Sequence, residues 1–86
     1  MNKYEIRGLI EVRNDDLDAT DRKASALVEK IRKILADDQW ETTSTNVNWL
    51  KEQAAALSEL MAKKDSLIRE IEEYRRLQER ILREEV

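Results

Sequence analysis

The chain has 86 residues, of which 41% are hydrophobic and 41% charged, and its formal net charge is −3. It contains no Cys, no His and no Pro, and a single Gly. Without Cys or His it lacks the side chains of disulfides, of the usual zinc sites and of most nucleophilic triads. We expect a single domain over residues 1–86 that is not an enzyme and that holds no cofactor and no metal.

About half of the chain consists of Ala, Glu, Lys, Leu and Arg, a composition typical of long helices and coiled coils. Charges of both signs are interleaved, so the chain has no general attraction for nucleic acid or anionic lipid. No apolar run approaches the roughly 18–20 residues of a membrane span, and charges stand where a secretory signal would be apolar. We therefore expect a cytoplasmic protein that does not bind membranes.

The first segment, residues 3–13, fits two patterns. With a period of two, Tyr4, Ile6 and Ile10 alternate with charged residues, as in a strand. With the period of a helix, Ile6 and Ile10 begin a heptad pattern that continues in phase into the next segment. A lone strand has no partner within the chain, and unpaired buried backbone groups are unfavourable. We choose the helix, with a candidate break near residues 14–16, where capping residues cluster.

The next segment continues as an amphipathic helix to about residue 37. Its apolar residues recur at intervals of three and four, the spacing of one helix face. Basic residues lie near its predicted C-terminus, where cations interact favourably with the helix dipole. The apolar positions are Leu17, Ala24, Leu27, Val28, Ile31, Ile34 and Leu35.

A polar stretch over residues 38–45 predicts the connection to a second helix over residues 46–84. No Gly or Pro interrupts this second helix, which is roughly 60 Å long at about 1.5 Å per residue. Ser44-Thr45-Asn46 supplies side chains suited to capping its first turn. Its stripe contains Leu50, Leu57, Leu60, Leu67, Ile71, Tyr74 and Ile81, and is widened by Ala54, Met61, Ile68, Leu77 and Leu82.

Two amphipathic helices joined by a short connection predict an all-α fold, an antiparallel hairpin of two long helices. A chain of this size buries about 60% of its unfolded surface, and a hairpin has only one seam in which to bury it. We therefore expect hairpins to associate, as a dimer or tetramer, into a helical bundle or coiled coil. Another protein that covers the stripe is the alternative partner.

The favoured function is protein–protein interaction, as an adaptor, inhibitor, chaperone-like or assembly protein that acts through apolar helix faces. Aromatic residues dominate binding hot spots, so Trp40 and Trp49 are candidate anchors. The competing interpretation is that the two Trp side chains close the end of the hairpin. The stripe of the second helix adds four candidate interaction residues, Leu57, Leu60, Ile71 and Tyr74.

The alternative function is a helical nucleic-acid-binding regulator that uses Lys23, Lys30 and Lys33 on one side of the first helix. Phosphate binding requires uncompensated positive charge, whereas acidic residues accompany the Arg-rich end of the second helix. No aromatic residues are interleaved with the bases for stacking. Nucleic acid is therefore the less favoured partner.

Some polar and charged positions are candidate ligand sites. Arg13, Lys64, Gln53 and Gln78 interrupt the stripes, and a polar pocket built from them inside a bundle is the basis of a third function, an enzyme or small-acid binder. The more favoured interpretation is that polar seam residues specify register and oligomeric state. The acidic run over residues 15–21 lacks the Gly and the closing Glu of a calcium loop.

Overall fold

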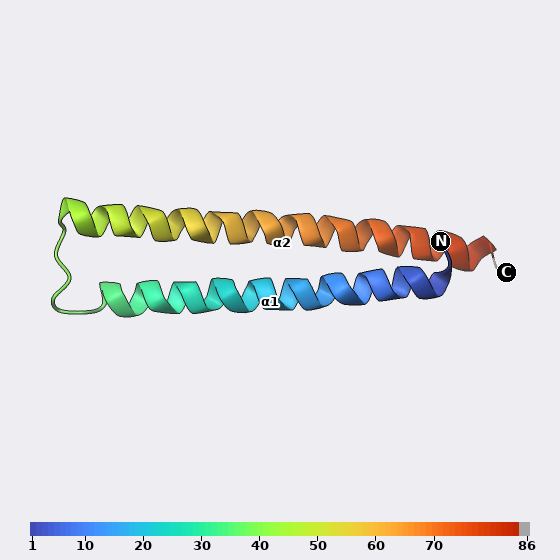
Figure 1. Cartoon of the computed structure of the whole chain (residues 1–86), viewed down its shortest axis with the longest axis horizontal. Coiled ribbons are helices and arrows are strands. Elements are labelled where there is room, and N and C mark those ends of the chain that lie inside the picture. The colour runs from blue at the N-terminus through green and yellow to red at the C-terminus, as the bar shows by residue number, and fades with distance from the viewer. Residues whose placement is uncertain (85–86) are drawn as a thin grey trace.

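The computed structural model describes residues 1–84 and confirms the all-α hairpin, with two antiparallel helices side by side (Figure 1). Helix α1 spans Lys3–Leu35, helix α2 spans Ser44–Glu84, and residues 36–43 connect them. The molecule is a rod of 65 × 17 × 14 Å. The N-terminus lies beside the last part of α2, at the end of the rod opposite to the connection. Within the described residues, neither helix has an apolar stretch long enough to span a bilayer.

Residues 3–13, which fit both a strand and a helix pattern, are helical. Asn2 caps the helix, because its side-chain oxygen accepts hydrogen bonds from the backbone N–H groups of Tyr4 at 3.0 Å and Glu5 at 2.9 Å. The side-chain amide of Asn2 also donates to the carboxylate of Glu5 at 3.0 Å. These bonds satisfy N–H groups that have no partner within the helix, which favours a helical start at this position.

The candidate break near residues 14–16 is absent, and α1 continues through it. The hydroxyl of Thr20, one turn further on, donates to the backbone oxygen of Asp16 at 2.8 Å within the helix. Apolar seam residues lie on both sides of the segment, with Ile10 buried before it and Leu17 packed against the core after it. The continuous seam therefore outweighs the weak local preference of Asn and Asp for helix ends.

Both helix boundaries at the connection lie two residues before the predicted ones, since α1 ends at Leu35 and α2 begins at Ser44. The cap of α2 is Thr43, which precedes the predicted capping run at residues 44–46. Its hydroxyl oxygen accepts a hydrogen bond from the backbone N–H of Asn46 at 3.1 Å. The side chain of Asn46 is used differently, donating to the backbone oxygen of Glu41 at 2.7 Å.

The buried core lies in the half of the rod that contains the chain termini. Ile6, Ile10 and Ile71 form a buried cluster, in which Ile6 is 0% and Ile71 is 4% exposed. Leu17, Tyr74, Leu77 and Ile81 pack against this cluster. Thr20, Ala24 and Leu67 are the other buried residues among those described. We call residues 1–24 and 65–84 the terminal half of the rod.

The remainder of the rod, residues 25–64, is called the connection half. No side chain in this fully described range is buried. Its seam residues, all half-buried, are Leu27, Ile31, Ile34, Leu50, Leu57 and Leu60. Apolar spacing therefore continues to the connection, but burial does not.

Candidate functional site

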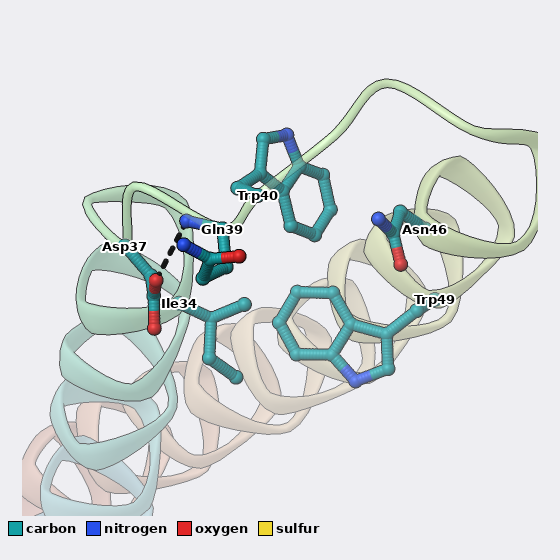
Figure 2. A pocket seen from close by; sticks show the side chains of 6 residues that line it. All are labelled: Ile34, Asp37, Gln39, Trp40, Asn46 and Trp49. Carbon is teal, nitrogen blue, oxygen red and sulfur yellow. Dashed lines mark hydrogen bonds between the residues drawn. The ribbon is translucent and has the colours of Figure 1, made fainter.

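The two Trp residues lie together at the connection end of the rod (Figure 2). Their ring centroids are 6.1 Å apart and their planes are inclined at 61°, an edge-to-face arrangement. Trp40 and Trp49 border an open hollow of about 340 Å³, which is also lined by Ile34, Asp37, Gln39 and Asn46. Both indole rings are half-buried. The pair thus closes the end of the hairpin while part of each ring stays accessible.

The four stripe candidates divide between the two halves of the rod. Ile71 belongs to the buried cluster, and Tyr74 packs against it with the guanidinium of Arg13 4.9 Å from its ring centroid. Leu57 and Leu60 are half-buried on the seam of the connection half. Ile71 and Tyr74 therefore hold this chain's own helices together, whereas Leu57 and Leu60 keep surface that another molecule can contact.

Arg13 and Lys64, the two bases that interrupt the stripes, each pair with a carboxylate of the other helix. The Arg13 Nε to Glu70 Oε2 distance and the Lys64 Nζ to Asp21 Oδ1 distance are both 2.8 Å. The sequence singled out both bases without identifying Glu70 as a partner. Each acid lies across the seam from its base once the connection is placed at residues 36–43, so the hairpin register is the signal that identifies these pairs.

The three lysines of the nucleic-acid alternative are exposed on α1. In the described part of the chain, none of them forms an ion pair. They belong to a basic segment, because residues 22–35 hold five basic residues and one acidic residue. Residues 3–21 hold six acidic and three basic residues. Helix α1 is therefore electrically polarised, with a charge of −3 in its first segment and +4 in its second.

The acidic run of α1 does not form a cluster. Asp21 is engaged by Lys64, and Asp15, Asp16 and Asp18 are exposed on the surface of the continuous helix. Among residues 1–84, no three His, Cys, Asp or Glu side chains come together in a way that suits a metal ion.

One face of the hairpin carries a row of apolar side chains from both helices, which we call the apolar face. Each of these residues comes directly after a seam residue. Along each helix they are separated by seven residues or by a multiple of seven. In an antiparallel helix pair, positions with this heptad relation lie on the same side of the seam. The apolar face consists of Val28, Leu35, Ala54, Met61, Ile68 and Leu82, and the same heptad positions hold Arg75 on α2 and Arg7, Asn14 and Asp21 on α1.

An open hollow of about 380 Å³ lies on the apolar face where the two helices meet. Val28 from α1 and Met61 from α2 both line it, which shows that the two helices contribute to one surface. Ala24 adds a third apolar wall. The polar side chains around the hollow are Asp21, Ser25, Glu29, Arg32 and Lys64. The sequence revealed the α2 members as a widening of the stripe, but not that Val28 and Leu35 face the same way.

Comparison with known proteins identifies no relative, since no family model, no curated protein and no solved structure matches the chain.

Two surfaces remain accessible for binding, the Trp40–Trp49 end and the apolar face. The apolar face is the longer, because it runs from Leu35 beside the connection to Leu82 near the chain termini.

Proposed function

We propose that this protein is a helical protein–protein interaction module that binds another helical surface through its apolar face. The carrying observation is the heptad row of six apolar side chains, of which the described chain leaves four exposed and two half-buried. Its largest members keep much of their surface in water, with Met61 37%, Leu35 41% and Leu82 47% exposed. Burial of apolar surface contributes about 25 cal/mol per Å². A partner that covers the row therefore gains a stabilisation that the hairpin alone lacks.

The total surface area supports this proposal. The chain exposes 6,706 Å², whereas a compact monomer of 10.2 kDa exposes about 5,300 Å² by the scaling of surface with mass. The excess of about 1,400 Å² is larger than the roughly 800 Å² that each partner buries in a standard interface. The rod therefore has enough surface for a specific partner without any change in its own fold.

The residues singled out by the sequence take different parts in this proposal. Leu57 and Leu60 widen the binding surface at the seam, whereas the Trp40–Trp49 pair is a separate surface at the connection end, because Trp49 points about 140° away from Ala54 around α2. Half-exposed Trp side chains are frequent anchors in protein interfaces. Adaptor, inhibitor, chaperone-like and assembly roles all use a surface of this kind.

The test places a photo-reactive amino acid at Met61 of the full chain, in the cells in which the protein occurs. The matched control places it at Ala62, which is exposed and points about 100° away around the same helix. We expect a covalent adduct with a polypeptide from position 61, weak or absent labelling from position 62, and loss of the adduct when Ile68→Glu is added. Equal labelling from the two positions, or none from position 61, would contradict the proposal.

Nucleic-acid binding is the second candidate, favoured by the exposed Lys23, Lys30 and Lys33 in the basic segment of α1. Phosphate contacts made by these lysines predict an affinity for DNA or RNA that falls steeply with salt. Fluorescence anisotropy with a labelled duplex and a labelled single strand measures this directly. Binding at low salt that disappears in the Lys23→Glu/Lys30→Glu/Lys33→Glu variant would support this candidate, and no binding at low salt would dismiss it.

A further inference from the structure

We infer that the partner of the apolar face is a second copy of this chain, packed antiparallel so that two hairpins form a four-helix bundle. This inference rests on the proposed function, because it names the occupant of the same face. The position of apolar residues about the middle of α2 and the charge on the side of α1 that borders the apolar face both support this arrangement.

On α2 the apolar face has members on both sides of the middle of the rod. Helix α2 spans Ser44–Glu84, so Met61 lies just before its midpoint and Ile68 just after it. The ion pair between Asp21 and Lys64 joins the two helices close to both of their midpoints. A two-fold axis that crosses the rod there, in the plane of the interface, brings Met61 of one copy to Ile68 of the second. A dimer with two-fold symmetry needs a self-complementary surface of this kind.

The hollow on the apolar face supplies a receiving site for Ile68 of the second copy. Met61 borders the hollow. Because the two-fold axis brings Ile68 of the second copy to Met61, it also brings Ile68 to the hollow. Insertion of an apolar side chain between residues of a facing helix is the packing mode of helical bundles. The axis repeats the insertion on the other copy and also brings the Leu35 end of one rod to the Leu82 end of the other.

The charge along α1 supports the antiparallel direction. The same two-fold axis lays α1 of one copy over α1 of the second in the opposite direction. On the side of α1 that borders the apolar face, Arg7, Glu11, Asp18 and Asp21 carry a net charge of −2, and they then face the part of the second copy's α1 that carries Arg32. Complementary charges across an interface suppress the wrong orientation and increase the rate of association.

The experiment measures mass and direction together on the full chain. Because the chain has no Cys, Ser44→Cys and Ala62→Cys each provide a single site for a spin label. Ser44 lies 20 residues from the middle of α2, so pulsed EPR in the antiparallel dimer should find the two labels about 60 Å apart. Ala62 lies beside the middle, so its labels should be less than about 35 Å apart in either direction of packing. Light scattering should give twice the chain mass of 10.2 kDa.

Two variants connect these readouts to the surfaces. Ile68→Glu should convert the dimer to a monomer that keeps its far-UV helicity, whereas Ala62→Glu on the outer surface should leave the dimer intact. Reversal of charge at Arg32, which lines the hollow on the apolar face, should raise the dimer Kd severalfold at low ionic strength, whereas reversal at Lys23, Lys30 and Lys33, which point about 140–160° away from Val28 around α1, should not. That difference should shrink in high salt, because salt screens exposed charges.

A short distance between the labels at position 44, or a chain that stays monomeric at all concentrations, would overturn the inference. Its failure is distinguishable from failure of the proposed function. An adduct from position 61 with a mass other than that of two copies keeps the interaction module and rejects self-association. Absence of any adduct from position 61 rejects both. A salt-sensitive complex of the monomer with nucleic acid would assign the basic segment of α1 to that ligand instead.

Discussion

The terminal half and the connection half of the rod have the same apolar spacing but different burial. In the terminal half the cluster of Ile6, Ile10 and Ile71 is shielded from water, whereas no side chain over residues 25–64 is buried. The residues that flank the seam differ in size. Leu77 covers the edge of the buried cluster, while Ala54 and Ala56 stand beside the seam near Leu57.

This difference has a general physical reason. A residue on a two-helix seam has one facing helix, so the edges of the seam are open to water unless long side chains cover them. Spacing therefore determines where a seam lies, and the size of the flanking residues determines whether it is dry. In this protein the uncovered seam and the apolar face lie partly in the same half, so that half leaves apolar surface exposed to water.

The largest expected effect compares one seam residue from each half. Ile71→Ala should lower the free energy of unfolding by about 2–5 kcal/mol, because it leaves a cavity in the buried cluster. Leu57→Ala should lower it by about 1 kcal/mol, because the side chain is only half-buried. Urea unfolding followed by far-UV circular dichroism at one fixed protein concentration measures both. Equal losses would mean that the connection half is as well buried in solution as the terminal half.

Hydrogen exchange tests the same comparison along the whole backbone. In dilute protein, the amides of residues 25–35 and 46–60 should exchange at least tenfold faster than those of residues 7–20 and 67–78. Opening the connection half exposes less buried apolar surface, so its local unfolding requires less free energy. Mass spectrometry of peptic fragments, normalised to the rates of the unfolded chain, provides the measurement. Uniform protection along both helices would remove the distinction between the halves.

The single Gly offers a smaller effect of opposite sign. Gly8 is an exposed helical residue, and a Cβ added there meets no atom within 4 Å. Gly8→Ala should therefore raise the free energy of unfolding by about 0.5–1 kcal/mol, since Ala loses less conformational freedom in a helix. The control Ala26→Gly, at an exposed site of the connection half, should have a smaller effect if that half opens separately. A shift in the urea midpoint reports both, and no gain from Gly8→Ala would contradict the helical environment of residue 8.

The smallest expected effect concerns the two ion pairs between the helices. Arg13 and Glu70 have side chains 24% and 44% exposed, and Lys64 and Asp21 have side chains 35% and 46% exposed. Double-mutant cycles should give a coupling of about 0.5–1 kcal/mol for the first pair and less for the second, because exposure weakens ion pairs. Repeating the cycles in 1 M salt should reduce both couplings. A larger coupling for Asp21–Lys64 than for Arg13–Glu70 would contradict the expectation that the less exposed pair is the stronger one.

Much of the fold was predictable because helix formation depends on near neighbours. The intervals of three and four between Leu50, Leu57 and Leu60 located α2, and the in-phase heptad resolved residues 3–13 as helix. Local signals misled where they competed with packing. Residues 14–16 have the composition of a helix end, yet the seam on both sides keeps α1 continuous. The cap of α2 was missed by one position, because several neighbouring residues have side chains that suit an N-cap and only Thr43 has the required geometry.

The candidate sites were less predictable, because they depend on contacts between the two helices and not on near neighbours in the chain. The apolar spacing by itself determined two helices, a seam and an excess of apolar residues over what one seam can bury. Tertiary structure alone decided that Arg13 meets Glu70, that Lys64 meets Asp21, and that Val28 and Met61 line one hollow. These contacts join residues far apart in the chain, so they depend on the register that the connection imposes on the two helices. Periodicity within one helix carries no information about that register.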